Sequence, residues 1–380
     1  MNQYLEAALK LHSFIVDKHW NGYAVIGPDP IGKINWRVTR FVRSYTMWLP
    51  WKDNLAYFQA QSYWIRDNLL LAELTGQDRF LKYVTPCADF IVEKQLASGA
   101  WEHPPLRERR GFISTVESVW ACLGLVAAYQ RLGKMSHLDA ALKGYNALIN
   151  VIGLRQFKDG LAINYHAHTS DLVPNVTTML LALVAEIHKT TGDRRYLEQT
   201  GALLRFLKYS QMENGELQYI YDWRPHFQCY QYNSFEFLDL AHYYQLTGDD
   251  QVLPILRKLA SYLATGLTER GSCRYDCFRE LPEVNYWTGA LATALCTAHK
   301  LGLGNYLALS ERASAYLLER QKPDGGFEFS RRNYGLLRDR RAYPRYLSMI
   351  LSFLSRLAKE QFSAEEVESS LPSDSLSIPD

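Results

Sequence analysis

The stretch FIVEKQLASGAW (residues 90–101) reads as the end of an amphipathic helix followed by a Gln-x-x-x-Gly turn. Glycine at the end of such a turn supplies the left-handed backbone residue that stops a helix. Four other segments resemble it: FLKYSQMENGEL (206–217), YLLERQKPDGGF (316–327), LRQFKDGLA (154–162) and YLATGLTERGSC (262–273). The glutamine recurs in all but the last of them, where leucine replaces it. The chain is therefore predicted to repeat one structural unit.

A second set of glycines ends a different kind of helix. These glycines follow apolar stretches at intervals of 57, 59, 56 and 54 residues, at Gly76, Gly133, Gly192, Gly248 and Gly302. Stretches such as STVESVWACLGLVAAYQRLG (114–133) are apolar on nearly all sides, and such a helix must be buried. Counting the two ends of the chain, we expect six hairpins, each with one amphipathic and one buried helix. The sequence thus predicts an all-α, single-domain, closed (α/α)6 toroid, with an open solenoid as the alternative.

Composition bounds the class of protein. The chain has 380 residues, 47% of them hydrophobic and 22% charged, which is ordinary for a globular domain. A net charge of +2 argues against nucleic-acid binding through overall basicity. We find no signal peptide and no run long enough to span a membrane, and the six cysteines form no C-x-x-C pair. We expect buried free thiols and a cytoplasmic location. The toroid is predicted to cover residues 1–360. Residues 361–380, which are acidic and rich in serine, are predicted to form a disordered tail.

Two known groups of toroids share these features. The Gln-x-x-x-Gly-x-Trp pattern of residues 90–101 resembles the repeat of terpenoid cyclases and protein prenyltransferases. The T-G-D turns in TGDRRYL (191–197) and TGDDQVL (247–253) are equally similar to those of six-hairpin carbohydrate-active enzymes. These include unsaturated-uronyl hydrolases, uronate epimerases and toroidal polysaccharide lyases. The resemblance covers residues 1 to about 360, and it implies the fold more strongly than any activity.

Arginine is abundant in the loops that precede the buried helices. In a toroid, the N-terminal ends of all inner helices lie on one face, so these loops form the rim of one cavity. Arginine binds carboxylate, sulfate or phosphate with two parallel donors, and helix N-termini add positive potential. We therefore expect a small anionic saccharide as substrate, although surface ion pairs are the alternative. The predicted substrate-binding arginines are Arg224, Arg274, Arg279, Arg340, Arg341 and Arg345.

Other polar and aromatic residues recur at the starts of the inner helices. Asparagines occur in VPNVTT, YNSFEF and VNYWTG, where they either cap the helices or bind sugar hydroxyls. The candidates for substrate binding are Asn175, Asn233, Asn285, Tyr286, Trp287 and Tyr343.

Candidate proton-transfer groups lie in the same regions. Glu117 and Glu236 occupy the first turns of apolar helices, where a carboxylate must be paired or have a raised pKa. Pairing with an arginine in a structural role is the alternative. The other catalytic candidates are Asp222, Asp276, Tyr232 and His166. His166 and His168 form a close pair, but no third ligand stands out, so we expect no metal and no cofactor.

Three functions remain open. The first is an enzyme acting on a uronate-containing saccharide by elimination, epimerisation or hydrolysis. The second is a prenyl-type enzyme binding a prenyl diphosphate, but D-x-D-D and D-D-x-x-D motifs are missing. For a zinc prenyltransferase, Asp276-Cys277 lacks the intervening residue and Tyr343-Pro344 lacks the expected histidine. The third is a non-catalytic toroid that binds a ligand or a protein.

Overall fold

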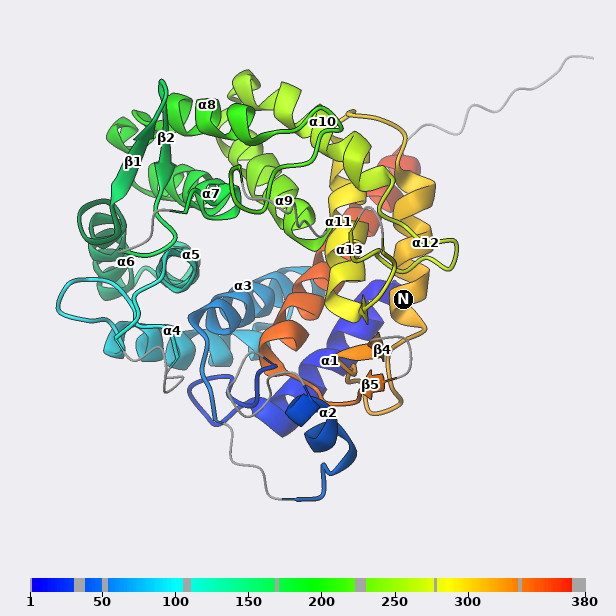
Figure 1. Cartoon of the computed structure of the whole chain (residues 1–380). Helices are drawn as coiled ribbons and strands as arrows, with labels where there is room; N and C mark the ends of the chain where they lie inside the picture. The colour runs from blue at the N-terminus through cyan, green and yellow to red at the C-terminus, as the bar shows by residue number, and fades with distance from the viewer. Residues whose placement is uncertain are drawn as a thin grey trace, which may run out of the picture.

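The computed structural model describes residues 2–30, 38–49, 54–104, 111–167, 171–222, 230–276, 279–333 and 337–370. Six helices lie around the middle of the molecule and six more lie outside them (Figure 1). The inner helices are α3 (Phe58–Thr75), α5 (Thr115–Leu132), α7 (Pro174–Thr191), α9 (Tyr230–Thr247), α11 (Asn285–Lys300) and α13 (Pro344–Ser370). The outer helices are α1 (Gln3–His19), α4 (Val84–Glu93), α6 (Met135–Ala147), α8 (Thr200–Ser210), α10 (Leu253–Ala264) and α12 (Leu307–Leu318).

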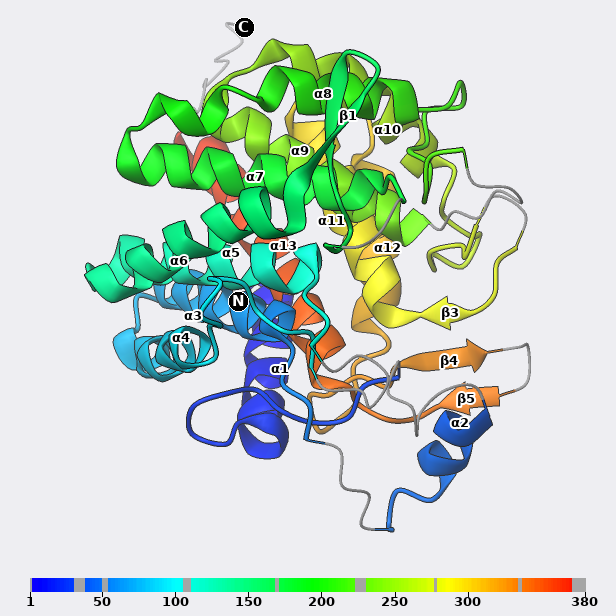
Figure 2. The ribbon, with the colours of Figure 1, turned by 60° about the vertical axis from the view of Figure 1, so that its left-hand side comes forward.

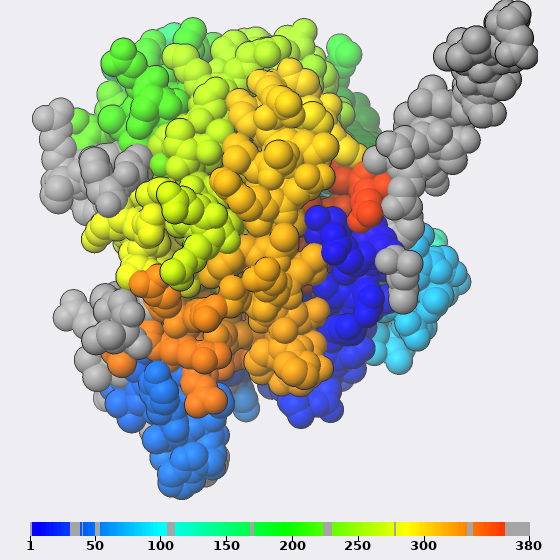
Figure 3. Space-filling model, turned by 90° about the vertical axis from the view of Figure 1, so that its right-hand side faces the viewer, coloured from blue at the N-terminus to red at the C-terminus, as the bar shows by residue number. Residues whose placement is uncertain are grey.

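The inner ring is closed. Each inner helix packs against the next along the chain, and α13 packs against both α11 and α3. The outer ring closes as well, since α12 lies next to α1 on the surface (Figure 3). In this contact, the side-chain amide of Gln321 donates to the carbonyl of Ala7 at 2.8 Å. The predicted (α/α)6 toroid is therefore confirmed, and the open solenoid is not formed.

Short elements join the two rings. Short 3-10 or π-helical segments precede or follow several outer helices: η2 (Asp78–Tyr83), η3 (Leu148–Gly153), η4 (Arg194–Leu197) and η5 (Asp250–Val252). The hairpin β1 (Leu154–Phe157) and β2 (Gly160–Ile163) is antiparallel, with Leu154 opposite Ile163. Strands β3 (Glu283–Val284), β4 (Ser330–Asn333) and β5 (Leu337–Asp339) form an antiparallel sheet in that order. Figure 2 shows this sheet beside the short helix α2 (Val38–Tyr45).

The repeated turn ties neighbouring outer helices together. The side-chain amide of Gln95 donates to the carbonyls of Gly99 and of Ala140 on α6, both at 2.8 Å. Gln211 does the same with Gly215, at 2.9 Å, and with Ile255 on α10, at 3.0 Å. The glycines have positive φ and press on the next outer helix. A Cβ on Gly99 would stand 2.6 Å from the carbonyl oxygen of Lys143. The turn is thus part of the scaffold.

One predicted copy of the turn is wrong. LRQFKDGLA forms the β1–β2 hairpin instead, and Gln156 donates to the carbonyl of Lys158 at 2.7 Å. The preceding helical segment η3 already ends at Gly153, which has a φ of +87°. The chain is therefore extended when it reaches Gln156, and no helix end is left for that glutamine to complete.

The inner helices have the burial expected of apolar sequences. Most of α5 and α7 is buried. Four inner helices end directly before a predicted glycine (Gly76, Gly133, Gly192 and Gly248), whereas α11 ends at Lys300, two residues before Gly302. All five glycines have a positive φ. The described cysteines are buried free thiols: Cys87, Cys122, Cys273 and Cys296. None of the helices that the described residues form is long and apolar enough to cross a membrane. Helix α13 continues to Ser370, and residues 371–380 lie outside the described part of the chain, so the disordered tail stays a prediction.

Candidate functional site

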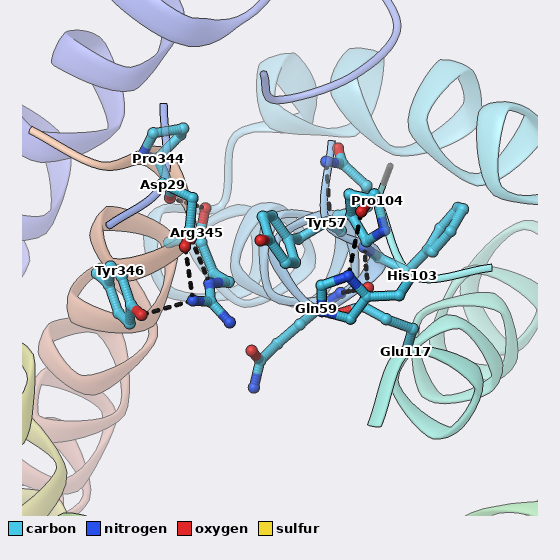
Figure 4. A network of polar contacts seen from close by, with 12 residues as sticks. Asp29, Tyr57, Gln59, His103, Pro104, Glu117, Pro344, Arg345 and Tyr346 are labelled. Carbon is cyan, nitrogen blue, oxygen red and sulfur yellow. Dashed lines mark hydrogen bonds and ion pairs between the residues drawn. The ribbon is translucent and has the colours of Figure 1, made fainter. Parts of the chain in front are cut away.

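Three inner helices bring polar side chains together at their N-terminal ends (Figure 4). Gln59 is the second residue of α3, Glu117 the third of α5 and Arg345 the second of α13. All three residues lie in the first turns of their helices, so the N-terminal end of the ring carries a polar group. Loop residues Asp29 and His103 complete the group. Because α13 and α3 are neighbours through ring closure, residues almost 300 positions apart in the sequence meet here.

Glu117 caps the neighbouring helix. Its Oε2 accepts hydrogen bonds from the backbone N–H groups of Phe58, at 2.6 Å, and Gln59, at 3.4 Å. These groups open α3, whose own N-cap residue Tyr57 provides no side-chain cap. Glu117 is only 1% exposed. Burial raises its pKa to about 7, although the charge of Arg345 and the two backbone donors act in the opposite direction. This carboxyl group can therefore accept or donate a proton near neutral pH.

Arg345 is held in a fixed orientation. Its Nε and Nη2 donate to the two carboxylate oxygens of Asp29, at 2.8 and 3.1 Å, and Nη2 also donates to the hydroxyl of Tyr346 at 2.5 Å. The guanidinium lies over the rings of Tyr57, at 4.3 Å, and Tyr346, at 4.6 Å. Such a two-pronged ion pair between buried groups sets geometry as well as charge. None of these hydrogen bonds uses Nη1, which remains available to a ligand.

Tyr57 and His103 form the side of the site between α3 and α5. The hydroxyl of Tyr57 is buried and has no hydrogen-bond partner among the described residues. Burial raises the pKa of this phenol, so it stays protonated and can act as a donor. The His103 ring lies 5.4 Å from the Tyr57 ring, and its Nδ1 is 3.1 Å from the carbonyl of Pro104. A neutral His103 therefore carries its proton on Nδ1.

Glu236 does not join this group. It lies on α9, is 1% exposed, and its Oε2 has no hydrogen-bond partner among the described residues. Burial, followed by the charges of Asp239 and Glu216, raises its pKa well above the usual range. The pKa of Glu117 is instead affected by the charges of Arg345 and Asp29. The two predicted acids therefore belong to separate clusters.

Several predicted rim arginines form ion pairs. Arg279 binds Asp276 through Nη2 and Nε, at 2.6 and 3.0 Å, and its backbone N–H donates to the same carboxylate. Arg274 lies 3.4 Å from Glu280. For these arginines the structure shows the surface ion pairs that the sequence left as the alternative. Asp276 is thereby held as a partner of Arg279.

The remaining rim residues lie close to α13. Arg340 is exposed, and its backbone N–H donates to Ser44 Oγ at 2.5 Å. Arg341 is 8% exposed and lies 5.2 Å from the centre of the Tyr343 ring. Tyr343 in turn donates its hydroxyl proton to Asp339 at 2.9 Å. Arg224 lies outside the described residues, as does His168.

The asparagines lie inside their helices and do not cap them. Asn233 exchanges hydrogen bonds with the backbone of Leu217, at 2.8 and 3.3 Å, and Asn285 donates to the carbonyl of Glu328 at 2.7 Å. Both therefore fasten a loop to the start of an inner helix, so the capping interpretation is wrong for them. Asn175 differs, because its amide nitrogen is buried with no partner among the described residues.

Other candidates lie apart from Glu117. Tyr286 packs on Tyr346 at 4.3 Å and lies next to Trp287, so both belong to an aromatic cluster at the starts of α11 and α13. Tyr232 packs on Tyr219 at 4.9 Å. Asp222 is exposed and has a φ of +57°. His166 pairs in a β-bridge with Ser114, directly before α5, and its ring lies 4.6 Å from Phe112.

Sequence reasoning missed four members of the site. Tyr57 and Gln59 stand at the start of an inner helix, where position within the repeat could have indicated them. Asp29 and His103 lie in the loops before α3 and α5, and because these loops differ in sequence from unit to unit, the repeat does not single out either residue. No group of three or more histidine, cysteine, aspartate or glutamate side chains with the geometry of a metal site occurs among the described residues.

Known structures share this architecture. A cellobiose 2-epimerase from Bacillus thermoamylovorans superposes with a TM-score of 0.72 and 13% identity, covering 94% of this chain and all of that one. A possible GH105 family member from Salmonella enterica gives 0.69 and 13%, covering 94% of each chain. A polysaccharide lyase gives 0.68 and 10%, covering 95% of this chain and 98% of that chain. No protein-family model matches the chain, and no curated protein matches its sequence.

These similarities concern the fold. The chain is an α/α toroid. It shares the architecture of toroidal carbohydrate-active enzymes over nearly its full length, whereas identities of 10–13% carry no residue-level correspondence. The roles of residues at the helix starts must therefore be argued from the geometry of this chain alone.

Proposed function

We propose that the protein is a carbohydrate-active enzyme that moves a proton on an acidic saccharide at the mouth of the toroid. The observation that carries the proposal is the position of Glu117. Its carboxyl group is buried at the N-terminal end of the ring with a pKa of about 7, beside Arg345. A general base or acid works best when its pKa lies near the working pH. The toroidal neighbours, which are a polysaccharide lyase, a cellobiose 2-epimerase and a possible GH105 family member, support a saccharide substrate, and the acidic group is inferred from the arginines of this chain.

Each residue of the group has a task in this proposal. Glu117 takes a proton from the carbon next to the sugar carboxylate or carbonyl. The free Nη1 of Arg345 and the hydroxyl of Tyr57 stabilise the negative charge that develops on the oxygen. Arg340, exposed in the loop before α13, supplies positive charge for a uronate group.

The same geometry favours epimerisation or elimination over hydrolysis. Glycoside hydrolysis requires two carboxyl groups that both act on the substrate. Among the described residues, the carboxylate whose charge acts on Glu117 is Asp29. Asp29 is 1% exposed and bound through both oxygens to Arg345. One available carboxyl group is suited to proton transfer, and the second is committed to holding the arginine.

The test is an incubation with uronate-containing and neutral oligosaccharides in heavy water. Deuterium uptake without cleavage indicates epimerisation, and a rise in absorbance from a 4,5-unsaturated product indicates elimination. Glu117→Gln should lower kcat by about 100-fold or more, because general acid–base catalysis contributes that much. Glu93→Gln, which changes an exposed carboxyl group on α4, should leave the rate unchanged. Full activity of Glu117→Gln, or hydrolysis of pre-cut substrates alone, would refute the proposed chemistry.

A further inference from the structure

A second group of polar side chains lies deeper on the axis of the toroid. A cavity of about 20 Å³ is bordered by residues of α3, α5, α7, α9 and α13. Aromatic rings form part of its wall, including those of Tyr63 and Trp120, whose centroids are 4.5 Å apart. Arg66, Arg356 and Asp239 also line it. A space of this size holds one or two atoms the size of a water molecule.

The cavity is separate from the mouth. Arg66 follows Gln59 on α3 by seven residues, and Arg356 follows Arg345 on α13 by eleven. With a rise of about 1.5 Å per residue, these arginines lie roughly 10 and 17 Å further along their helices than the mouth residues. The lining residues include none of those that surround Glu117. The two sites are therefore distinct.

Neither arginine has a bonded counter-ion in the described part of the chain. Neither guanidinium makes a hydrogen bond or an ion pair with another of the described residues, although each is only partly exposed. They are close enough that the charge of Arg66, after burial, contributes to lowering the pKa of Arg356. Positive groups that are half-buried and near each other are unfavourable unless an anion neutralises them.

Three carboxyl groups lie near the two arginines. Asp67, next to Arg66 on α3, is 1% exposed, and burial raises its pKa well above the usual range. Glu186 binds His242 through Oε1 at 2.7 Å and accepts from the Gln130 amide through Oε2 at 3.1 Å. Asp239 accepts from the hydroxyl of Thr178 at 3.3 Å, and burial raises its pKa to about 7. Burial thus favours the neutral forms of Asp67 and Asp239, and Glu186 is bonded to His242, so part of the positive charge of the two arginines is left uncompensated near neutral pH.

We propose that this axial cavity binds a small anion of about the size of chloride between Arg66 and Arg356. Guanidinium groups offer several N–H donors in a plane, which suits an anion held between two of them. The volume excludes a sugar or a nucleotide. The helix macrodipole does not replace the anion, because its field falls off within the last turn and Arg66 lies in the middle of α3.

The first experiment measures thermal unfolding of the full chain in gluconate and in chloride at constant ionic strength. Chloride should raise the Tm saturably, by about 2 °C or more, because a ligand that binds only the folded state stabilises it. Arg66→Gln and Arg356→Gln should each abolish this chloride dependence. Arg257→Gln, an exposed arginine on α10, should retain it. Equal melting of the wild type in both salts, or an unchanged response in both cavity variants, would overturn the proposal.

A second experiment does not depend on the variants folding. Crystals of the wild-type protein soaked in bromide should show an anomalous peak in contact with both guanidinium groups. A data set in which bromide binds only on the outer surface would overturn the assignment. The result is independent of the proposed enzyme activity, because it concerns a different set of residues.

Discussion

Glu117 performs a structural and a chemical task with one carboxyl group. As a cap it accepts two backbone N–H groups at the start of α3, and these bonds favour its charged form. Burial opposes that charge and dominates, which leaves the pKa at about 7. An exposed capping glutamate would remain ionised at neutral pH. The position of Glu117 inside the ring is therefore what converts a helix cap into a group that can exchange protons.

This balance predicts a pH-dependent stability. The unfolded chain releases the Glu117 proton near pH 4.5, whereas the folded chain holds it to about pH 7. Between these values the folded state binds more protons, so the free energy of unfolding falls as pH rises, by about 3 kcal/mol at most. Glu117→Gln should remove this part of the slope in denaturant titrations between pH 4.5 and 7. Glu93→Gln should keep the wild-type slope, and parallel slopes for all three proteins would contradict the assignment.

At this scale the sequence indicated part of the site. Glu117 and Arg345 could be predicted because each follows the start of an inner helix. Asp29, which fixes Arg345, could not be predicted, since it lies more than 300 residues away in a loop whose sequence does not follow the repeat. The ion pair of Asp276 with Arg279 shows the reverse case, in which a residue chosen for catalysis holds a loop together.

Among the secondary-structure elements, the repeated glutamine links its turn to the next outer helix. Its amide satisfies a carbonyl in its own turn and a carbonyl of the next outer helix, as Gln211 does with Gly215 and Ile255. The carbonyl of Ile255 lies inside α10 and already accepts a backbone N–H of its own helix, so the amide adds a second donor there and links the turn to the helix. In the turn of residues 262–273, Leu267 stands at the position of the glutamine, so one unit of the ring forms without this amide.

Removing one such tie should destabilise the protein measurably. Gln211→Ala deletes two hydrogen bonds to backbone carbonyls, and we expect a loss of about 1–3 kcal/mol in the free energy of unfolding. Gln156→Ala is the matched control, because this glutamine is exposed and bonds only the carbonyl of Lys158. Its effect should be within about 0.5 kcal/mol. Equal losses for both variants, measured by urea denaturation, would contradict the role of the turn.

The same comparison explains which elements could be predicted. The pattern Gln-x-x-x-Gly specifies the tie where a helix precedes it, as in residues 90–101. At LRQFKDGLA the pattern is present, but Gly153 has already ended the helix and the chain turns into a hairpin. The Gln-x-x-x-Gly spacing alone could not predict the hairpin, because the hairpin depends on Gly153, which lies outside the pattern.

At the scale of the whole molecule, ring closure determines where chemistry is possible. Helices apolar on all sides predicted a closed toroid, and α13 completes it between α11 and α3. Closure also brings Arg345 to Glu117 (Figure 4). Which loop residues face the mouth could not be predicted from the sequence, because the loops differ in length and meet only after the ring has closed.

We expect the mouth formed by α3, α5 and α13 to bind the saccharide. The most direct measurement is a crystal structure of Glu117→Gln soaked with an intact uronate oligosaccharide, since this variant should bind without turnover. We predict sugar density in contact with residue 117, Tyr57 and Arg345. Density confined to the outer surface, or a mouth that stays without sugar at saturating concentration, would show that the saccharide does not bind there.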